Sequence, residues 1–201
     1  YNKGNFNFEI EADIWLGEKF ETWSFYKNRI ADYDGDGDMD IFVADGGLDV
    51  WTDRFAPGAK DAMLWNVDGK FFVDRGNENT WGFNGFTHQM DTADVNNDGH
   101  PDLVVGYGTT QYTIDHCVAE IGPHYTEQQS FKDMIRVLIN DGTGSFTPES
   151  HCLQIQTITD ETEQRLGFDG KQWFDRAGAT IVLGDFDGDG NVDYFQGDLG
   201  F

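Results

Sequence analysis

Short apolar runs recur along the chain, and glycines and acidic residues separate them. The runs are brief and rich in β-branched and aromatic residues, a composition that favours strands over helices. The strands that we expect beside the acidic stretches are 25–31, 40–45, 87–93, 102–107, 178–184 and 193–198. Two further segments, Met63–Arg75 and Ile135–Ser150, have a glycine turn between two such runs and predict β-hairpins.

Three acidic stretches join the expected strands in pairs and share one pattern. They read DYDGDGDMD at 32–40, DVNNDGHPD at 94–102 and DFDGDGNVD at 185–193, so the common frame is D-x-[DN]-x-D-G-x-x-D. Side chains at positions 1, 3, 5 and 9 carry oxygen in every copy, and a backbone carbonyl at position 7 adds another donor. Because Ca²⁺ takes roughly six to eight oxygens from alternating loop positions, we expect about three Ca²⁺ ions.

The candidate metal ligands follow from these positions. The first loop supplies Asp32, Asp34, Asp36, Asp38 and Asp40, with Asp38 contributing its carbonyl. The second loop supplies Asp94, Asn96, Asp98, His100 through its carbonyl, and Asp102. The third loop supplies Asp185, Asp187, Asp189, Asn191 through its carbonyl, and Asp193. Position 6 is Gly37, Gly99 or Gly190, where the loop must turn sharply.

Two other interpretations of the acidic loops fit less well. An EF-hand loop opens in the same way, but it needs a Glu at position 12 and helices on both sides. Position 12 here is Val43, Val105 or Gln196, and the flanks predict strands, so an EF-hand is excluded. Acidic turns without metal would also use Asp and Gly. They would not require carboxylates at positions 1, 5 and 9 three times over.

The repeated unit predicts a particular fold. Each loop with its two strands, followed by a hairpin, makes four antiparallel strands, and such units around an axis are blades of a β-propeller. The phrases TADVNNDGHPDLVVGYG and VLINDGTGSFTPES resemble the FG-GAP and VCBS repeats of integrin-α-type propellers. The resemblance implies an all-β propeller of four-stranded antiparallel blades, with calcium loops in the 1–2 turns.

The repeats do not add up to a closed ring. We expect the end of a preceding blade and its connection at 1–22, blades at 23–76 and 86–150, an insertion at 108–132, a connection at 151–176 and a partial blade at 177–201. Each blade needs neighbours to bury its faces. We therefore expect a fragment of a longer propeller, with roughly six to eight blades as in the family. A four-bladed ring with one split blade is the alternative.

Charge limits the partners that the chain can bind. The formal net charge is −24, and 12 of the 37 acidic residues lie in the three loops, so three Ca²⁺ ions would bring the charge to about −18. Such a surface disfavours nucleic acid and anionic membranes. No apolar run is long enough to span a bilayer, so we expect no membrane insertion. Weak calcium loops function where calcium is millimolar, and we expect an extracellular or cell-surface location.

The chain has two cysteines, Cys117 and Cys152. In an extracellular setting a pair predicts a disulfide. The bond would close a loop of about 36 residues, which stabilises a fold by roughly 3–4 kcal/mol in the chain-entropy model. Each cysteine follows a histidine, so a two-His, two-Cys metal site is the alternative, although the spacing of structural zinc sites is absent.

The strand order also predicts a ligand-binding face. The 1–2 and 3–4 turns of a four-stranded meander lie at one face, so the long insertions and both cysteines would lie at the other. Long loops on a rigid scaffold commonly carry binding sites. The candidate ligand-binding residues there are Trp51, Trp81, His116, His124 and Trp173. They suit a protein or carbohydrate ligand, but aromatic residues also pack within blade cores.

These observations favour a binding role over catalysis. The sequence has no G-x-S-x-G, no H-E-x-x-H and no phosphate-binding glycine loop, so we do not expect an enzyme. We expect an extracellular, lectin-like or adhesive propeller module in which calcium is structural. One alternative is a self-assembling structural subunit of a surface filament or appendage. The other is a part, catalytic or not, of a secreted polysaccharide-active enzyme.

Overall fold

The computed structural model describes residues 4–5, 14–21, 25–46, 59–76, 84–108, 134–152 and 178–198. Within these ranges the chain forms eleven strands, numbered β1 to β11, and the turns that join them. In the same ranges, no helix has the length and apolar character needed to cross a membrane. The fold of the described chain is therefore all-β.

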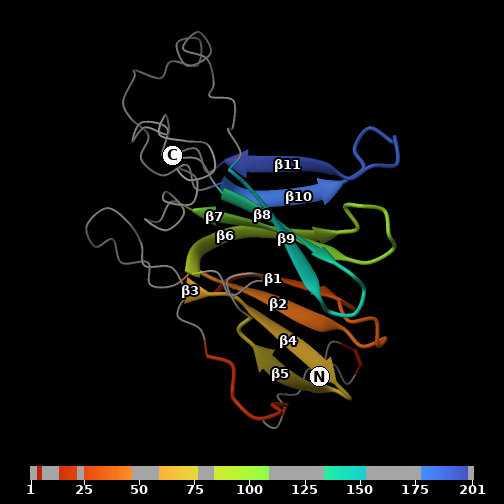
Figure 1. Cartoon of the computed structure of the whole chain (residues 1–201). Coiled ribbons are helices and arrows are strands. Elements are labelled where there is room, and N and C mark those ends of the chain that lie inside the picture. The colour runs from red at the N-terminus through yellow and green to blue at the C-terminus, as the bar shows by residue number, and fades with distance from the viewer. Residues whose placement is uncertain are drawn as a thin grey trace, which may run out of the picture.

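The first sheet has four antiparallel strands in the order β1-β2-β4-β5 (Figure 1). Its strands are β1 (Phe25–Ala31), β2 (Asp40–Asp45), β4 (Ala62–Val67) and β5 (Lys70–Asp74). The first acidic loop connects β1 to β2, whose last pair is Ala31 with Asp40. Both strands have the bounds expected from the apolar runs.

The second sheet repeats this plan and adds one short strand. Its main strands are β6 (Asn84–Ala93), β7 (Asp102–Gly108), β8 (Met134–Asn140) and β9 (Phe146–Cys152), in that order. The added strand, β3 (Ala59–Lys60), pairs with the first two residues of β6. The sequence did not predict β3, because two residues carry no periodic pattern. The pairing is possible because β6 begins three residues before the expected strand at 87–93.

The third sheet has two described strands, β10 (Gly178–Gly184) and β11 (Asp193–Asp198), which pair antiparallel. The third acidic loop connects them. The register ends with Gly184 opposite Asp193, just as Ala31 lies opposite Asp40 and Ala93 opposite Asp102 at the other two loops. The three strand–loop–strand units are thus built alike.

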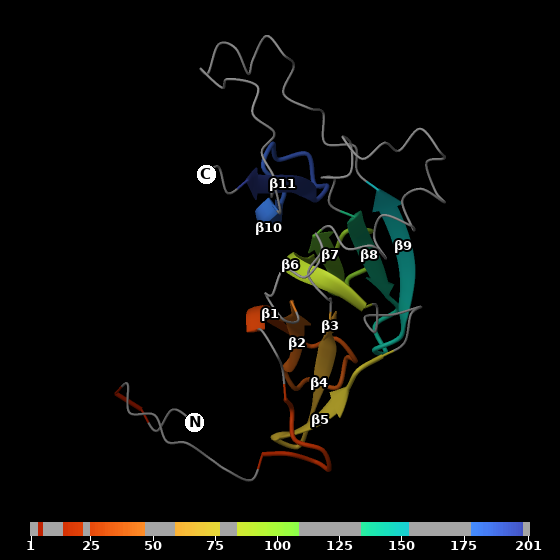
Figure 2. The same ribbon diagram turned by 90° about the vertical axis from the view of Figure 1, so that its left-hand side faces the viewer.

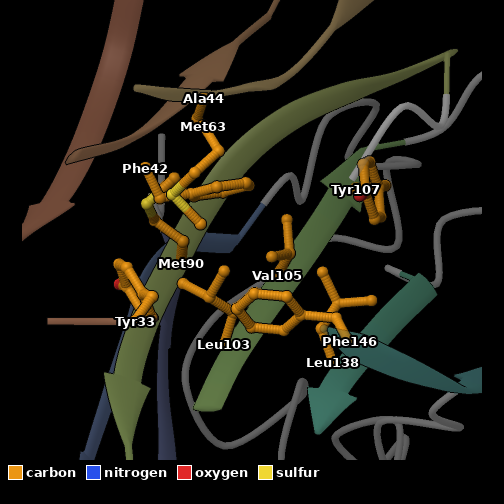
Figure 3. Close-up of a cluster of buried hydrophobic side chains, with 10 residues drawn as sticks. All are labelled: Tyr33, Phe42, Ala44, Met63, Met90, Leu103, Val105, Tyr107, Leu138 and Phe146. Carbon is orange, nitrogen blue, oxygen red and sulfur yellow. The ribbon is translucent and has the colours of Figure 1, made fainter. Parts of the chain in front are cut away.

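The sheets stack in chain order, with β6 lying against β1 and β2 on one side and against β10 on the other (Figures 1 and 2). The core between the first two sheets comprises Tyr33, Phe42, Ala44, Met63, Met90, Leu103, Val105, Tyr107, Leu138 and Phe146 (Figure 3). A smaller core of Val104, Ile135 and Ile181 joins the second sheet to the third. Antiparallel four-stranded sheets stacked in this way are consistent with a propeller fragment. The described strands do not form a closed ring.

The three acidic loops and the β8–β9 turn lie at the same end of the sheets, on the right of Figure 1. This is the end at which the sequence predicted the 1–2 and 3–4 turns. At the other end, β2, β7 and β9 finish at Asp45, Gly108 and Cys152. Cys117 lies outside the described residues, so the disulfide with Cys152 stays a prediction.

Candidate metal centres

The three acidic loops share one internal hydrogen-bond pattern. The carboxylate at position 1 accepts the backbone N–H of the position 6 glycine, at 3.0, 2.8 and 2.9 Å in the first, second and third loops. The side-chain oxygen at position 3 accepts the N–H of position 5 at 3.2, 3.0 and 3.1 Å. The carboxylate at position 5 accepts the N–H of position 7 at 2.8, 2.9 and 2.8 Å. Each loop therefore turns its N–H groups onto its own acidic side chains.

Left-handed backbone at two positions makes this winding possible. Position 6 has φ of 94°, 93° and 88° and is glycine in all three loops. Position 4 has φ of 75° at Gly35, 61° at Asn97 and 81° at Gly188. Glycine adopts this conformation freely, and asparagine is one of the few other residues that tolerate it. The left-handed backbone therefore explains why position 6, where the sequence predicts a sharp turn, is glycine in all three loops.

The aspartate at position 9 closes each loop. Its Oδ2 atom accepts the N–H of position 2 at 3.0, 2.9 and 2.9 Å in the three loops. In the first two loops its Oδ1 atom also accepts an N–H from the third strand of the sheet. Asn66 donates to Asp40 and Asn140 donates to Asp102, each at 2.8 Å. The loop conformation is thus tied directly to the sheet.

The electrostatics of position 9 favour a bound cation. Asp40 and Asp102 are both fully buried. Burial raises the pKa of Asp40 to about 6, with a further contribution from the Asp34 and Asp36 carboxylates, although hydrogen bonds from two backbone N–H groups act in the opposite direction. Burial also raises the pKa of Asp102. A desolvated carboxylate among like charges is unfavourable, and a nearby cation would offset that penalty.

Carboxylates converge in two of the loops as a hard cation requires. Ligand oxygens from positions 1, 3 and 9 lie within 4.8 Å of one another in the first loop (Asp32, Asp34, Asp40) and in the third (Asp185, Asp187, Asp193). Ca–O bonds are about 2.3–2.6 Å, so oxygens on one ion lie up to about 5 Å apart. The donor set and its spacing fit Ca²⁺ in both loops.

The second loop has an amide at position 3 in place of a carboxylate. The Oδ1 atom of Asn96 accepts the same backbone N–H that position 3 accepts in the other loops. Its Nδ2 atom donates to Asp98 Oδ2 at 2.8 Å, and this bond lowers the pKa of Asp98. An amide oxygen is also a calcium ligand, so the second loop keeps an oxygen at position 3 while carrying less charge.

The other predicted ligand-binding residues cannot be placed. Trp51, Trp81, His116, His124 and Trp173 lie outside the described residues, as does Cys117. The ligand-binding face therefore stays a prediction. Within the described ranges, the structure brings together the side-chain oxygens of positions 1, 3 and 9 in the first and third loops.

Sequence reasoning missed two asparagines that support the loops. The Nδ2 atom of Asn66 donates to Met39 O at 3.2 Å, and that of Asn140 donates to Pro101 O at 3.1 Å. The two asparagines hold equivalent positions. Each follows by two residues the leucine that pairs with position 10 of the loop unit: Leu64 pairs with Ile41, and Leu138 pairs with Leu103. A signal was present in the sequence, since each predicted hairpin has an Asn just before its glycine turn.

Sequence reasoning also missed a buried carboxyl group between the first two sheets. Asp61 is fully buried. Its Oδ1 atom accepts the N–H of Asp45 at 2.9 Å, and its Oδ2 atom accepts the hydroxyl of Thr87 at 3.0 Å. Burial raises the pKa of Asp61 well above its usual value. A neutral carboxyl group is therefore favoured in the folded chain.

A third missed residue, Asp91, joins all three sheets. Its Oδ1 atom accepts from Arg29 Nε of β1 at 2.6 Å, and its Oδ2 atom accepts the N–H of Leu183 in β10 at 2.8 Å. Asp91 itself belongs to β6, so one carboxylate links β1, β6 and β10, which belong to three successive sheets.

One comparison with known proteins identifies a part of the chain. No curated protein matches it. Residues 86–113 match the sequence model of the FG-GAP repeat family. Within the described residues, the match covers most of β6, the second acidic loop and β7. The chain therefore carries an FG-GAP repeat, as the acidic loops and their flanking strands had predicted.

Proposed function

We propose that this chain is an extracellular, calcium-binding β-propeller segment that serves adhesion or recognition without catalysing a reaction. Ca²⁺ would occupy each acidic loop, held by the side chains at positions 1, 3, 5 and 9 and by the carbonyl at position 7. Its role would be structural. A protein or carbohydrate ligand would meet the end of the sheets opposite the acidic loops.

The common geometry of the three loops is the observation that carries this proposal. Three segments far apart in the sequence adopt the same pattern of hydrogen bonds, and two of them bring three carboxylates within 4.8 Å. Like charges do not converge without a compensating cation except at a cost. Oxygen donors alone, without sulfur or imidazole nitrogen, select a hard cation such as Ca²⁺.

Calcium would act by stabilising the turns. It would offset the repulsion among the loop carboxylates and hold the 1–2 turn of each blade. With a Kd of roughly 0.1–1 mM and calcium near 1 mM, each site would add about 0.4–1.4 kcal/mol to the free energy of unfolding. Sites this weak are filled outside cells, which is the reason for proposing an extracellular location.

Thermal unfolding with calcium and with EGTA tests the proposal. We expect Tm to rise with calcium, and we expect a calorimetric titration to find about three sites. Mg²⁺ at the same concentration serves as the control, because a smaller ion that demands octahedral geometry fits these loops poorly. Equal Tm values with calcium and EGTA, together with no heat of binding, would rule out the calcium assignment.

The proposed ligand face needs a separate test, because calcium binding does not reveal a partner. Binding to a glycan array, or capture of a defined protein ligand, should weaken in Trp51→Ala and Trp81→Ala. A ligand whose affinity is the same for both variants would count against this placement. Calcium titration of the variants checks that the loops are intact.

A further inference from the structure

The β8–β9 turn lies between two acidic loops. Its residues 140–146 belong to the second sheet, yet they contact the first loop as well as the second. Gly144 donates its backbone N–H to Tyr33 O, at position 2 of the first loop, at 3.1 Å. The rings of Phe146 and Tyr33 also pack together, with centroids 6.0 Å apart. We call residues 140–146 the bridging hairpin.

Asn140 makes the link between the loops through its own atoms. Its Nδ2 atom donates to Tyr33 O at 2.8 Å and to Pro101 O at 3.1 Å. Its backbone N–H donates to Asp102, the position 9 carboxylate of the second loop, at 2.8 Å. Asn140 is fully buried. One residue therefore holds position 2 of the first loop and positions 8 and 9 of the second.

The bridging hairpin fits against both loops without spare room. A Cβ atom added at Gly35 of the first loop would lie 2.8 Å from Gly142 O. A Cβ atom at Gly142 would clash with the His100 ring of the second loop, and one at Gly144 would lie 3.2 Å from Asp34 Cβ. The hairpin therefore lies in close contact with both loops, and this contact can carry a displacement of one loop to the other.

We propose that the first and second loops bind Ca²⁺ with positive cooperativity, transmitted by the bridging hairpin and Asn140. This inference rests on the proposed calcium binding. Calcium in the second loop would hold Asp102 in place, and with it Asn140 and the carbonyl of Tyr33. The first loop would then bind calcium with part of its ordering already complete, which raises its affinity. The reverse path gives the same coupling factor.

Site-resolved NMR of the ¹⁵N-glycine-labelled chain tests the coupling. The position 6 glycines Gly37, Gly99 and Gly190 each donate to the position 1 carboxylate of their own loop, so each amide resonance reports calcium at one site. Calcium is titrated into the wild-type chain and into two variants, each of which has one loop disabled.

The two variants are matched at positions 1 and 5. In Asp32→Asn with Asp36→Asn, calcium affinity at Gly99 should fall at least about five-fold. In Asp94→Asn with Asp98→Asn, affinity at Gly37 should fall by the same factor. The hydrogen bonds of Asn140 and Gly144 run to the first and second loops, so the third loop serves as the internal control.

Asn140→Asp then assigns the coupling to the hairpin. This side chain has the same shape, but it cannot donate to Tyr33 O, so disabling one loop should change the affinity of the other less than it does in the wild type. The matched control is Asn66→Asp, since Asn66 supports its own loop through Met39 O. It should weaken the first loop and leave the dependence of one loop on the other intact.

The outcomes separate this inference from the proposed function. One result would be that calcium shifts the amide resonances of all three glycines while the affinity of each loop stays the same whether or not the other loop is disabled. That result would overturn the cooperativity but would still support calcium binding. A dependence that persists undiminished in Asn140→Asp would overturn the role of the Asn140 side chain. No calcium shift at any glycine would refute the proposed function itself. If Asn140→Asp does not fold, the two disabled-loop variants still decide whether the loops are coupled.

Discussion

At the scale of single residues, buried carboxyl groups do two different kinds of work in this protein. The position 9 aspartates of the first two loops are buried, accept backbone N–H groups and lie near other acidic side chains, so a cation would offset the cost of their burial. Asp61 does not lie in an acidic loop, although, besides burial, the Asp45 carboxylate is close enough to contribute to its raised pKa. It accepts from Asp45 and Thr87 between two sheets, and burial raises its pKa. Its raised pKa favours the neutral form.

Asp61→Asn should therefore change how stability depends on pH. A carboxyl group with a raised pKa in the folded chain contributes stability that is complete below its unfolded pKa and is lost as pH rises through its folded pKa. The Asn variant has no such loss, so its free energy of unfolding should gain on that of the wild type from pH 4 to pH 8, by at most about 1.4 kcal/mol per pH unit. Guanidinium denaturation in calcium-free buffer measures the difference.

A control with the opposite sign is available in the same chain. Asp141 is exposed, and hydrogen bonds from Thr143 lower its pKa. Stability from this group is present above its unfolded pKa and is lost as pH falls. Asp141→Asn should thus lose ground to the wild type only as pH rises toward about 4, and its free energy of unfolding should run parallel to that of the wild type from pH 4 to pH 8. Equal pH profiles for wild type and Asp61→Asn would contradict the raised pKa of Asp61.

Asp91 offers a second test at the residue scale. Asp91→Ala leaves the N–H of Leu183 without its acceptor and should lower the free energy of unfolding by about 1–3 kcal/mol. Arg29→Met removes the ion pair but keeps that hydrogen bond, and an ion pair this exposed to solvent contributes less than about 1 kcal/mol. Denaturation of both variants in EGTA checks this order. A larger loss for Arg29→Met would contradict it.

At the scale of elements, the same acidic loop has different surroundings in different sheets. The bridging hairpin covers the first loop, with Gly144 bonded to Tyr33. A Cβ atom at Gly188 of the third loop, in contrast, would meet nothing within 4 Å. Gly35 and Gly188 hold the same position with φ of 75° and 81°. The two glycines differ in tertiary contact rather than in local conformation.

This difference predicts unequal effects of one substitution. Gly188→Ala should cost about 1–2 kcal/mol, since it forces a side chain into left-handed backbone. Gly35→Ala has the same penalty and also places a Cβ atom 2.8 Å from Gly142 O, so overpacking should add about 1–3 kcal/mol. Denaturant unfolding in calcium-free buffer compares the two variants. An equal loss of unfolding free energy in the two variants would mean that the hairpin moves away from the new side chain at no cost.

At the scale of the whole molecule, equivalent residues of successive sheets show how each sheet covers the one before it. Tyr33 and Phe42, at positions 2 and 11 of the first unit, pack against the second sheet. Val95 and Val104 hold these positions in the second unit and pack with Ile181 of the third sheet. In the third unit the same positions are Phe186 and Phe195, which are 60% and 59% exposed.

The exposed side chains of Phe186 and Phe195 should let the third sheet associate with apolar partners. We expect the chain to bind the dye ANS and to associate with rising concentration, because exposed aromatic side chains attract apolar partners. Phe186→Ser with Phe195→Ser should reduce both effects without loss of stability. Phe42→Ser is the matched control and should unfold the chain, since Phe42 is fully buried. Dye fluorescence and sedimentation velocity measure the outcomes, and unchanged dye binding in the double variant would contradict the expectation.

The sequence by itself determined the strands beside the loops, the loop frame and the family of the repeat. These features depend on local order, because alternation along a strand and the spacing of oxygens around a turn need only neighbouring residues. The strands at 25–31, 40–45 and 178–184 have the bounds that the apolar runs predicted.

Only the tertiary structure decided which residues join the sheets. Asn140 bonds Tyr33 across 107 positions of the sequence, and Asp91 bonds Leu183 across 92. Asp61 is buried because a second sheet lies against the first. Contacts of this kind arise when one sheet stacks on another. The pattern of apolar and polar residues within one strand does not indicate which residues of another sheet will pack against it.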